Sequence, residues 1–265
     1  MAVMARPIRR PWIPRDVMVS ALTVVTIVAV WTVVTTVFRV SPLILPSPRA
    51  MGDELQVLLA SGYAAKPLYV HVAASLFRSL TGLVAGIALA IPIGLAMGYN
   101  RTISAALVPV FGFFRPIPPI AFIPLMILWF GIGELSKILL IFAASFNYTV
   151  LNSAAGMRAV PDQLIRKGRN LGLTRWQLFS SVMLPAAMPH IFTGIKTSTA
   201  VSWAIVVAAE LIAAQEGLGF IIQDAGTFFR ITDVFLGIFI IGLIGVSLEL
   251  LISFIERRTL HWQGK

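Results

Sequence analysis

Long stretches without charged side chains recur along the chain, and each is long enough to cross a lipid bilayer as a helix. A helix rises about 1.5 Å per residue, so roughly 20 residues span a hydrocarbon core of about 30 Å. The stretches are residues 17–38, 79–100, 102–133, 138–157, 189–214 and 234–255, three of which include isolated ionisable residues. This pattern predicts an all-α, polytopic integral membrane protein with about six transmembrane helices.

Composition supports the membrane assignment. Of the 265 residues, 58% are hydrophobic and 12% are Asp, Glu, Lys or Arg, and the mean hydropathy is +0.89. A soluble domain contains about 25% charged residues, so this chain has too little charge to cover its own surface. It has no cysteine and only three scattered histidines, His71, His190 and His261. We therefore expect no disulfide, no metal site and no cofactor bound by this chain.

The distribution of Lys and Arg predicts the orientation. With a cytoplasmic N-terminus, thirteen of the 21 basic residues fall in cytoplasmic segments, as expected when short basic loops stay inside. Residues 1–16 and 257–265 become cytoplasmic tails of one membrane domain, residues 17–256. Residues 17–38 are too long for a signal-peptide core and predict an uncleaved anchor. The net charge of +10 then reflects topology, and the basic residues are too sparse for a nucleic-acid partner.

Two further patterns concern packing. Residues 51–59 form a mildly amphipathic run that predicts a helix at the membrane interface. Glycines recur at four-residue spacing, at Gly82 and Gly86 and again at Gly94 and Gly98. Small residues let membrane helices approach closely, so we expect packing within the chain, with a dimer seam as the alternative.

Residues 158–185 differ in composition from the spans and predict a cytoplasmic helical hairpin. Asp162 suits the first turn of one helix, and Gly172 is placed to end it in the left-handed conformation. Thr174 and Gln177 form a capping-box pattern for a second helix, which we expect to end before Pro185.

The hairpin carries exposed apolar residues beside basic ones, as a docking element for a cytoplasmic protein would. An amphipathic loop lying on anionic membrane lipid is the alternative. The docking candidates are Asp162, Arg166, Gly168, Arg169, Leu171, Gly172, Leu173, Trp176, Leu184 and Pro185.

The same segment resembles a known family. Gly172, nine residues, and then Val182-x-Leu184-Pro185 is similar to the loop signature of ATP-binding cassette (ABC) importer permeases, which reads Glu-Ala-Ala, three residues, Gly, nine residues, Ile-x-Leu-Pro. Residues 115–119, 129–134 and 208–219 also resemble the branch that imports taurine, other sulfonates, nitrate and related anions. One departure is that residues 166–168 are Arg-Lys-Gly in place of Glu-Ala-Ala.

The resemblance implies a transport subunit that is not itself an enzyme. It implies a bacterial inner membrane location, two copies of the chain forming the pathway, and a periplasmic binding protein that delivers the solute. It also implies that residues 158–185 contain the coupling helix, which docks on a dimer of ATPase subunits that bind ATP and Mg²⁺. The nearest string to a phosphate-binding loop, Gly194-Ile-Lys-Thr197, has the wrong spacing and lies in a span.

Ionisable and aromatic residues within the spans are the candidates for the pathway, since a charge near mid-bilayer costs about 2.5–3.5 kcal/mol on insertion scales. Arg115, in a proline-rich stretch, could attract a small anion or form a structural pair, and Glu210 could gate the outer end or form a structural pair. Arg78 and Lys196 are expected to snorkel or pair. The candidates are Phe114, Arg115, Pro119, Trp129, Phe130, Phe146, Trp203 and Glu210.

Taurine or another sulfonate is the solute we favour, with nitrate next and aromatic carboxylates behind. A rival from another class is an ion-coupled secondary transporter. Such proteins usually contain internal repeats, and the two halves of this chain show none.

Overall fold

The structure, a computed structural model, describes residues 15–262 and consists of helices joined by loops, without a named strand in that range. Residues 1–14 and 263–265, which belong to the two expected tails, lie outside the described part. Five helices are long and apolar enough to span a membrane, or six if one bent pair counts as a single span, so the predicted fold class is confirmed. The elements are α1 (Arg15–Thr36), α2 (Pro48–Ser61), α3 (Leu68–Tyr99), α4 (Arg101–Phe114), η1 (Pro119–Phe122), α5 (Ile123–Phe130), α6 (Glu134–Arg158), α7 (Asp162–Asn170), α8 (Arg175–Leu178), η2 (Phe179–Met183), α9 (Leu184–Ala213), α10 (Leu218–Thr227) and α11 (Ile231–Thr259).

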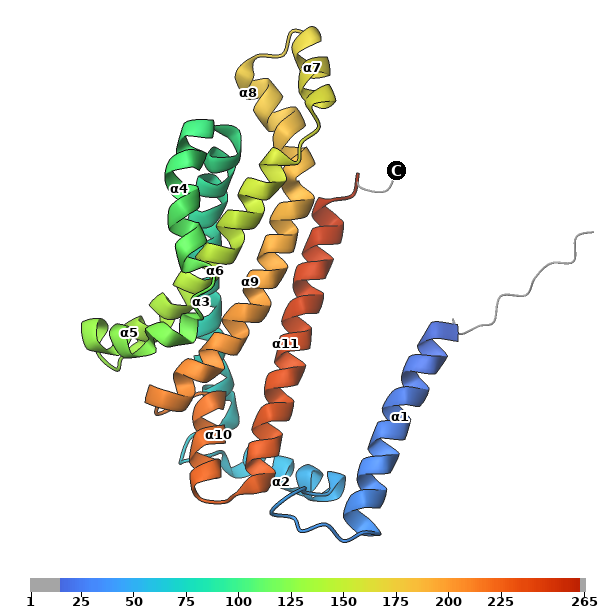
Figure 1. The fold of residues 1–265 in the computed structure, drawn as a ribbon. Helices are drawn as coiled ribbons and strands as arrows, with labels where there is room; N and C mark the ends of the chain where they lie inside the picture. Colours follow the sequence, from blue (N-terminus) through green and yellow to red (C-terminus); the bar gives the residue numbers. More distant parts are fainter. Residues whose placement is uncertain (1–14, 263–265) are drawn as a thin grey trace, which may run out of the picture.

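Helix α6 packs between α3 and α9 at the centre of the bundle (Figure 1). The regularly spaced glycines of α3 make this possible, because they face α6. A Cβ atom at Gly86 would lie 1.9 Å from Ser145 Oγ, and one at Gly94 would lie 2.5 Å from the Val150 carbonyl oxygen. The four-residue glycine spacing therefore serves packing within the chain, as in other closely packed membrane helices.

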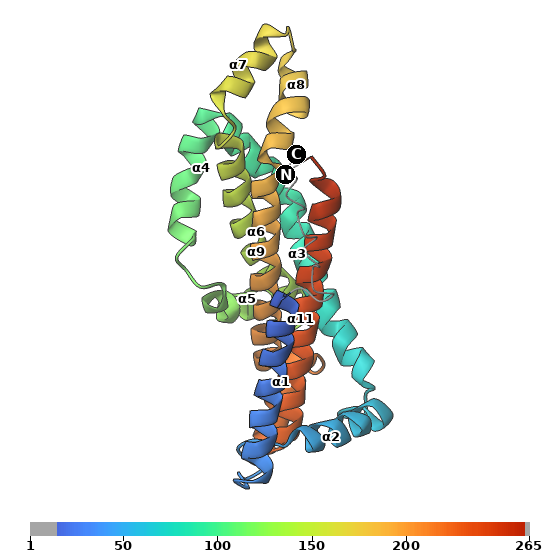
Figure 2. The ribbon, with the colours of Figure 1, turned by 90° about the vertical axis from the view of Figure 1, so that its right-hand side faces the viewer.

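Helix α11 packs along α9 and α10, whereas α1 stands beside the bundle with its apolar side chains exposed (Figures 1 and 2). The base of α1 is held by Trp31, whose Nε1 donates to the Pro46 carbonyl oxygen at 3.0 Å. The predicted amphipathic helix is α2, which begins at Pro48 after the cap residue Ser47 and buries Met51 and Leu58.

The predicted start of the second span at residue 79 is wrong. Helix α3 begins at Leu68 and carries Arg78 in its interior. An arginine interrupts a charge-free window, but it need not end a helix where acidic partners neutralise it. Arg78 has two such partners, Glu134 and Glu210.

Residues 102–133 do not form one straight span. Helix α4 and the η1–α5 segment meet at an angle of 85°, and α5 lies crosswise to α4 (Figure 1). Pro116, Pro118 and Pro119 fall in the connection and lack the N–H donors that a continuous helix needs. The bend exposes irregular backbone beside α6, and such backbone is tolerated at membrane depth only against protein or a water-filled cavity.

Candidate functional site

The helical hairpin projects from one end of the bundle, where α7 and α8 lie beyond the other helices (Figure 2). Gly172 ends α7 with φ of +76°, a left-handed conformation that glycine adopts without strain. Gln177 N donates to Thr174 Oγ1 at 3.3 Å, and Thr174 N donates to Gln177 Oε1 at 2.9 Å. The predicted left-handed stop and the capping box are both confirmed.

The hairpin exposes apolar side chains at its tip. Leu171 and Trp176 are 81% and 72% exposed, while Gly168 is buried beneath Leu178 and Leu173. The side chains of Asp162, Arg166 and Arg169 are exposed as well. The tip thus combines basic charge with unpaired apolar surface, which is the composition of a protein-docking surface.

The predicted end of the second helix before Pro185 is wrong. Helix α8 continues through the π-helical segment η2 into α9, so that Leu184 and Pro185 lie in the first turn of the long helix. Proline lacks a backbone donor and its ring clashes in a regular α-helix. The wider π turn accommodates both defects, and it joins the hairpin to a membrane-spanning helix.

A cavity of about 480 Å³ lies where α4, η1 and α5 meet α6. Five of the predicted pathway residues line it, and they come from every wall. They are Phe114, Arg115, Pro119, Trp129 and Phe146. The lining is mainly aromatic and aliphatic, with a few polar groups, as in most small-molecule sites.

The polar end of this cavity adjoins a second one of about 230 Å³. Arg115, Asn147 and Tyr148 line both, and Asn152 lines the second. Asn147 was not among the predicted site residues, although its amide in the uncharged stretch 138–157 was a visible signal. The proline-induced bend therefore brings Arg115 of one element against two polar residues of another.

Phe130, Trp203 and Glu210 do not line these cavities. Phe130 ends α5 with its side chain exposed. Trp203 is buried against α11 and donates from Nε1 to the Ile241 carbonyl oxygen at 3.0 Å. On the same face Lys196 pairs with Glu256, so one of the two expected arrangements for Lys196 is observed.

Glu210 is buried in an ion cluster at the opposite end of the bundle from the hairpin, and the cluster reaches the surface at Glu134. Arg78 Nη1 donates to Glu210 Oε1 at 2.6 Å, and Arg78 Nη2 donates to Glu134 Oε1 at 2.8 Å. Lys137 Nζ lies 3.0 Å from the same Glu134 oxygen. The cluster links α3, α6 and α9. Arg78 was expected either to snorkel or to form a pair, and the structure shows it paired.

The loop between α9 and α10 is built around the Glu210 carboxylate. Ser75 Oγ donates to it at 2.8 Å, and Gly219 N donates at 2.9 Å. Gly217 has φ of +129°, and a Cβ atom there would lie 2.4 Å from the Glu210 carboxyl carbon. The Gly-Leu-Gly sequence at 217–219 is therefore required by close approach of the backbone to a buried charge.

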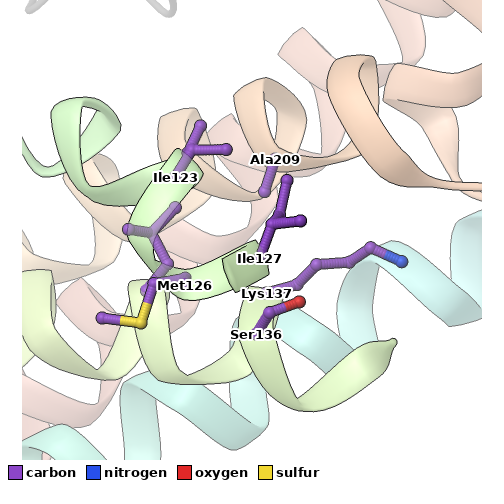
Figure 3. Close-up of a pocket in the computed structure, with 7 residues that line it drawn as sticks. Ile123, Met126, Ile127, Ser136, Lys137 and Ala209 are labelled. Carbon is purple, nitrogen blue, oxygen red and sulfur yellow. The ribbon is translucent and has the colours of Figure 1, made fainter. Parts of the chain in front are cut away.

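Beside this cluster, α5 rests on α6 and α9 through an apolar contact that leaves a void of only about 10 Å³. Figure 3 shows Ile123 and Ile127 of α5 on the side of Ala209 of α9, with Met126 farther from it, while Lys137 extends its ammonium group away from them. The crosswise helix α5 therefore packs against α6 and α9, and it forms one wall of the cavity of about 480 Å³.

A partly exposed ion pair involves a residue of the same loop. Lys66 forms an ion pair with Glu216, and the hydrogen bond from Lys66 lowers the pKa of Glu216 below its usual value. Within residues 15–262, no group of three or more His, Asp or Glu side chains is arranged to hold a metal ion.

Comparison with known proteins gives a consistent result. The family model of the binding-protein-dependent transport system inner membrane component matches residues 82–261. The taurine transport system permease protein TauC of Escherichia coli (strain K12) is 40% identical over 263 residues, covering 98% of this chain and 96% of that protein. The putative aliphatic sulfonates transport permease protein SsuC of Bacillus subtilis (strain 168) is 34% identical over 238 residues, covering 90% and 85%.

The fold is also that of a solved transporter. The structure of the MetNI methionine ABC transporter in inward-facing conformations superposes with a TM-score of 0.61 at 20% identity, covering 75% of this chain and 96% of that chain. At this identity the likeness concerns the fold. The family match and the sequence relatives go further: the chain belongs to the binding-protein-dependent inner membrane components, the multi-pass permease subunits of ABC importers.

Proposed function

We propose that this permease imports taurine or a closely related alkanesulfonate. The observation that carries the proposal is the 40% identity to a taurine permease, which extends over nearly the whole chain. Arg115, an exposed arginine that lines the cavity and forms no ion pair among residues 15–262, agrees with an anionic or zwitterionic solute. Nitrate and aromatic carboxylates remain the alternative solutes within the family.

We infer that the energy comes from a separate ATPase dimer that binds ATP and Mg²⁺. The string nearest to a phosphate-loop pattern, residues 194–197, is continuous helix within α9. A phosphate-binding loop instead needs a glycine-rich turn that leads into a helix N-terminus. The permease then contributes a pathway and its gating, and no covalent chemistry.

The hairpin is the proposed docking element for that ATPase. Its exposed tip at Leu171 and Trp176 supplies apolar contacts, and Arg166 and Arg169 supply charge. Because α8 runs without a break into α9, a displacement of the hairpin is passed directly to a helix that packs on α6 and α11. ATP-driven closure of the ATPases would thereby open the pathway outward.

The proposed assembly contains two permease copies, with a periplasmic binding protein at the end opposite the hairpin. The N- and C-terminal tails are cytoplasmic in this arrangement. The described helices agree with it, since α1 starts and α11 ends toward the hairpin end of the bundle (Figure 1). The exposed face of α4 and α5, which carries the cavity, would face the shared pathway.

Uptake by the complete transporter in proteoliposomes tests the solute. The permease, its ATPase and its binding protein are reconstituted, and ATP-dependent accumulation of labelled taurine, ethanesulfonate, nitrate and benzoate is compared. Taurine or ethanesulfonate should accumulate at least about tenfold more efficiently than nitrate. Efficient transport of nitrate or benzoate, with neither sulfonate accumulated, would show that the proposed solute is wrong.

A further inference from the structure

The short helix α5 lies between the cavity beside α6 and the end of the bundle opposite the hairpin. It packs on the first turns of α6, at Ser136, Lys137 and Leu140. The cavity of about 480 Å³ begins beyond this contact and follows α6 over residues 140–148, and the adjoining cavity continues toward the hairpin over residues 147–155. On this face of α6, α5 therefore closes the cavity toward that end of the bundle.

The contact between α5 and the bundle is apolar. Residues 119–130 contain no charged side chain, and the single side-chain N–H or O–H group among them is Trp129 Nε1. Trp129 itself is exposed. The side that rests on the bundle includes the buried Ile123 together with Ile127, which lie toward Ala209 of α9 (Figure 3). Apolar contacts are not directional, so this contact can be released and formed again without breaking specific hydrogen bonds.

The segments on both sides of η1 and α5 are interrupted helix. Pro116 and Pro118 precede the segment and lack the N–H donors that would continue α4. Gly131 and Gly133 follow it, and Gly131 has φ of +76°. A Cβ atom at either glycine would have no atom within 4 Å, so this link is not packed against the rest of the chain. Such loop positions are where hinges absorb large changes in φ and ψ.

The residue directly after the glycine link is held in place. Glu134 begins α6, and its Oε1 accepts a hydrogen bond from Arg78 Nη2 at 2.8 Å and lies 3.0 Å from Lys137 Nζ. Arg78 is buried and also pairs with Glu210. A rotation of α5 would therefore end at the glycine link and leave α6 where it is, as in a hinged element on a rigid frame.

We propose that the η1–α5 segment, residues 119–130, is a gate of the solute pathway. It swings on residues 116–118 and 131–133 and opens the cavity toward the end of the bundle opposite the hairpin. In the structure the gate is closed on α6 and α9, and its residues Phe122, Met126 and Trp129 line the cavity. This assignment rests on the proposed function, and it names the element that the ATP-driven rearrangement would move.

A thiol placed in the contact tests the gate without reference to the solute. The chain contains no cysteine, so Ile123→Cys introduces a single buried thiol. The complete transporter, with its ATPase and binding protein, is reconstituted in lipid nanodiscs, and the labelling rate by a charged maleimide is measured. The ATPase carries a glutamine in place of its catalytic glutamate, so that ATP stays bound. Addition of ATP should raise the labelling rate at least about tenfold, because the open state becomes the populated one.

Ile141→Cys is the matched control for labelling. Ile141 is buried on α6, where it contacts Gly82 of α3 and lies outside the gate. Its labelling rate should stay low with and without ATP. An equal rise at Ile141→Cys and Ile123→Cys would contradict the gate, because it would mean that the whole bundle loosens.

A disulfide across the contact tests whether transport needs the movement. Ile127→Cys with Ala209→Cys places thiols on two elements that line the same void of about 10 Å³. Oxidation should lower ATP-dependent taurine uptake at least about tenfold, and reduction should restore it. The control is Gly226→Cys with Val234→Cys in the α10–α11 turn, where a Cβ atom at Gly226 lies 3.9 Å from Val234 Cγ2. Its oxidation should leave uptake within about twofold of the reduced protein.

Two results would overturn the gate. One is undiminished uptake by Ile127→Cys with Ala209→Cys after the disulfide has formed, and the other is a labelling rate at Ile123→Cys that ATP does not change. The labelling result does not depend on which solute is carried. A transporter that accumulates no sulfonate, but shows the rise in labelling, would contradict the proposed solute and support the gate.

Discussion

Arg78 and Glu210 form a fully buried ion pair, with 2.6 Å between Nη1 and Oε1, that joins α3 to the end of α9. Removing one partner from such a pair leaves an uncompensated buried charge, which typically costs about 3–5 kcal/mol. We therefore predict that Arg78→Leu strongly lowers the thermal stability of the purified permease. The measurement is thermal unfolding in detergent, followed by intrinsic fluorescence or loss of monodisperse protein.

Lys66→Met is the control for this prediction. It breaks the partly exposed pair with Glu216, which lies in the loop between α9 and α10. Exposed ion pairs contribute about 0–1 kcal/mol. A double variant, Arg78→Leu with Glu210→Leu, should recover part of the loss, because no lone charge stays buried at that pair. Equal stability of Arg78→Leu and Lys66→Met would contradict the importance given to the buried pair.

The surroundings of two glycines, one packed between α3 and α6 and one on an open face of α4, predict opposite outcomes for substitution by alanine. A methyl group at Gly86 would overlap Ser145, so Gly86→Ala should lower stability by about 1–3 kcal/mol. Gly112 lies within α4, and no atom outside its immediate helix backbone approaches within 4 Å of the added carbon, so Gly112→Ala should be neutral or stabilise by about 0.5–1 kcal/mol. Comparative thermal unfolding of the two variants decides this, and a loss at Gly112 equal to that at Gly86 would refute the packing argument.

The hairpin prediction concerns assembly. Leu171→Ala and Trp176→Ala remove exposed side chains, so the permease should fold normally while its affinity for the ATPase falls about tenfold or more. Phe228→Ala, at an equally exposed position near the other end of the bundle, should leave that affinity unchanged. Copurification and quantitative binding measure the effect, and unaltered ATPase binding by both hairpin variants would argue against docking there.

The replacement of Glu-Ala-Ala by Arg166, Lys167 and Gly168 implies a changed charge partner. We expect an acidic ATPase residue to face Arg166 or Arg169. Reversal to Glu at both arginines should weaken assembly, and a compensating acidic-to-basic change on the ATPase should restore it. A structure of the complex with neither arginine within ion-pair distance of the ATPase would refute this expectation.

Acidification should affect the α9–α10 loop slightly through Glu216. Its pKa is lowered in the folded protein by the hydrogen bond from Lys66, so the pair stabilises the fold above the usual carboxyl pKa and this contribution is lost as the pH falls. Because both side chains are partly exposed, the effect is at most about 1 kcal/mol. Glu216→Gln should reduce the pH dependence of thermal unfolding between neutral pH and about pH 4. An unchanged dependence would show that the pair contributes nothing measurable.

Charge-free length predicted the spans well, since bilayer thickness sets that length directly. It misplaced the start of α3, because Arg78 is neutralised by residues that are distant in sequence, and such pairing is invisible in a local window. Capping chemistry correctly predicted Gly172 and Thr174, whose partners are local. The continuation through Pro185 was missed, because a π turn depends on packing as well as on sequence.

The cavity was partly predictable. Arg115 among prolines indicated irregular backbone, and aromatic residues of the surrounding segments do line the cavity. Asn147 was not singled out, since only the 85° bend between α4 and α5 brings it into a shared cavity with Arg115. Trp203 faces α11 and does not line the cavity. This could not be predicted, because the periodicity of an apolar helix does not specify which neighbour each face contacts.

The most direct test of the account is whether solute uptake requires ATP hydrolysis by a separate subunit. The permease is reconstituted with its binding protein and with an ATPase whose catalytic glutamate is replaced by glutamine, and taurine accumulation is measured with and without an imposed ion gradient. The account predicts that accumulation is lost under both conditions and returns with the wild-type ATPase. Accumulation driven by the ion gradient without ATP hydrolysis would contradict it and would favour a secondary transporter.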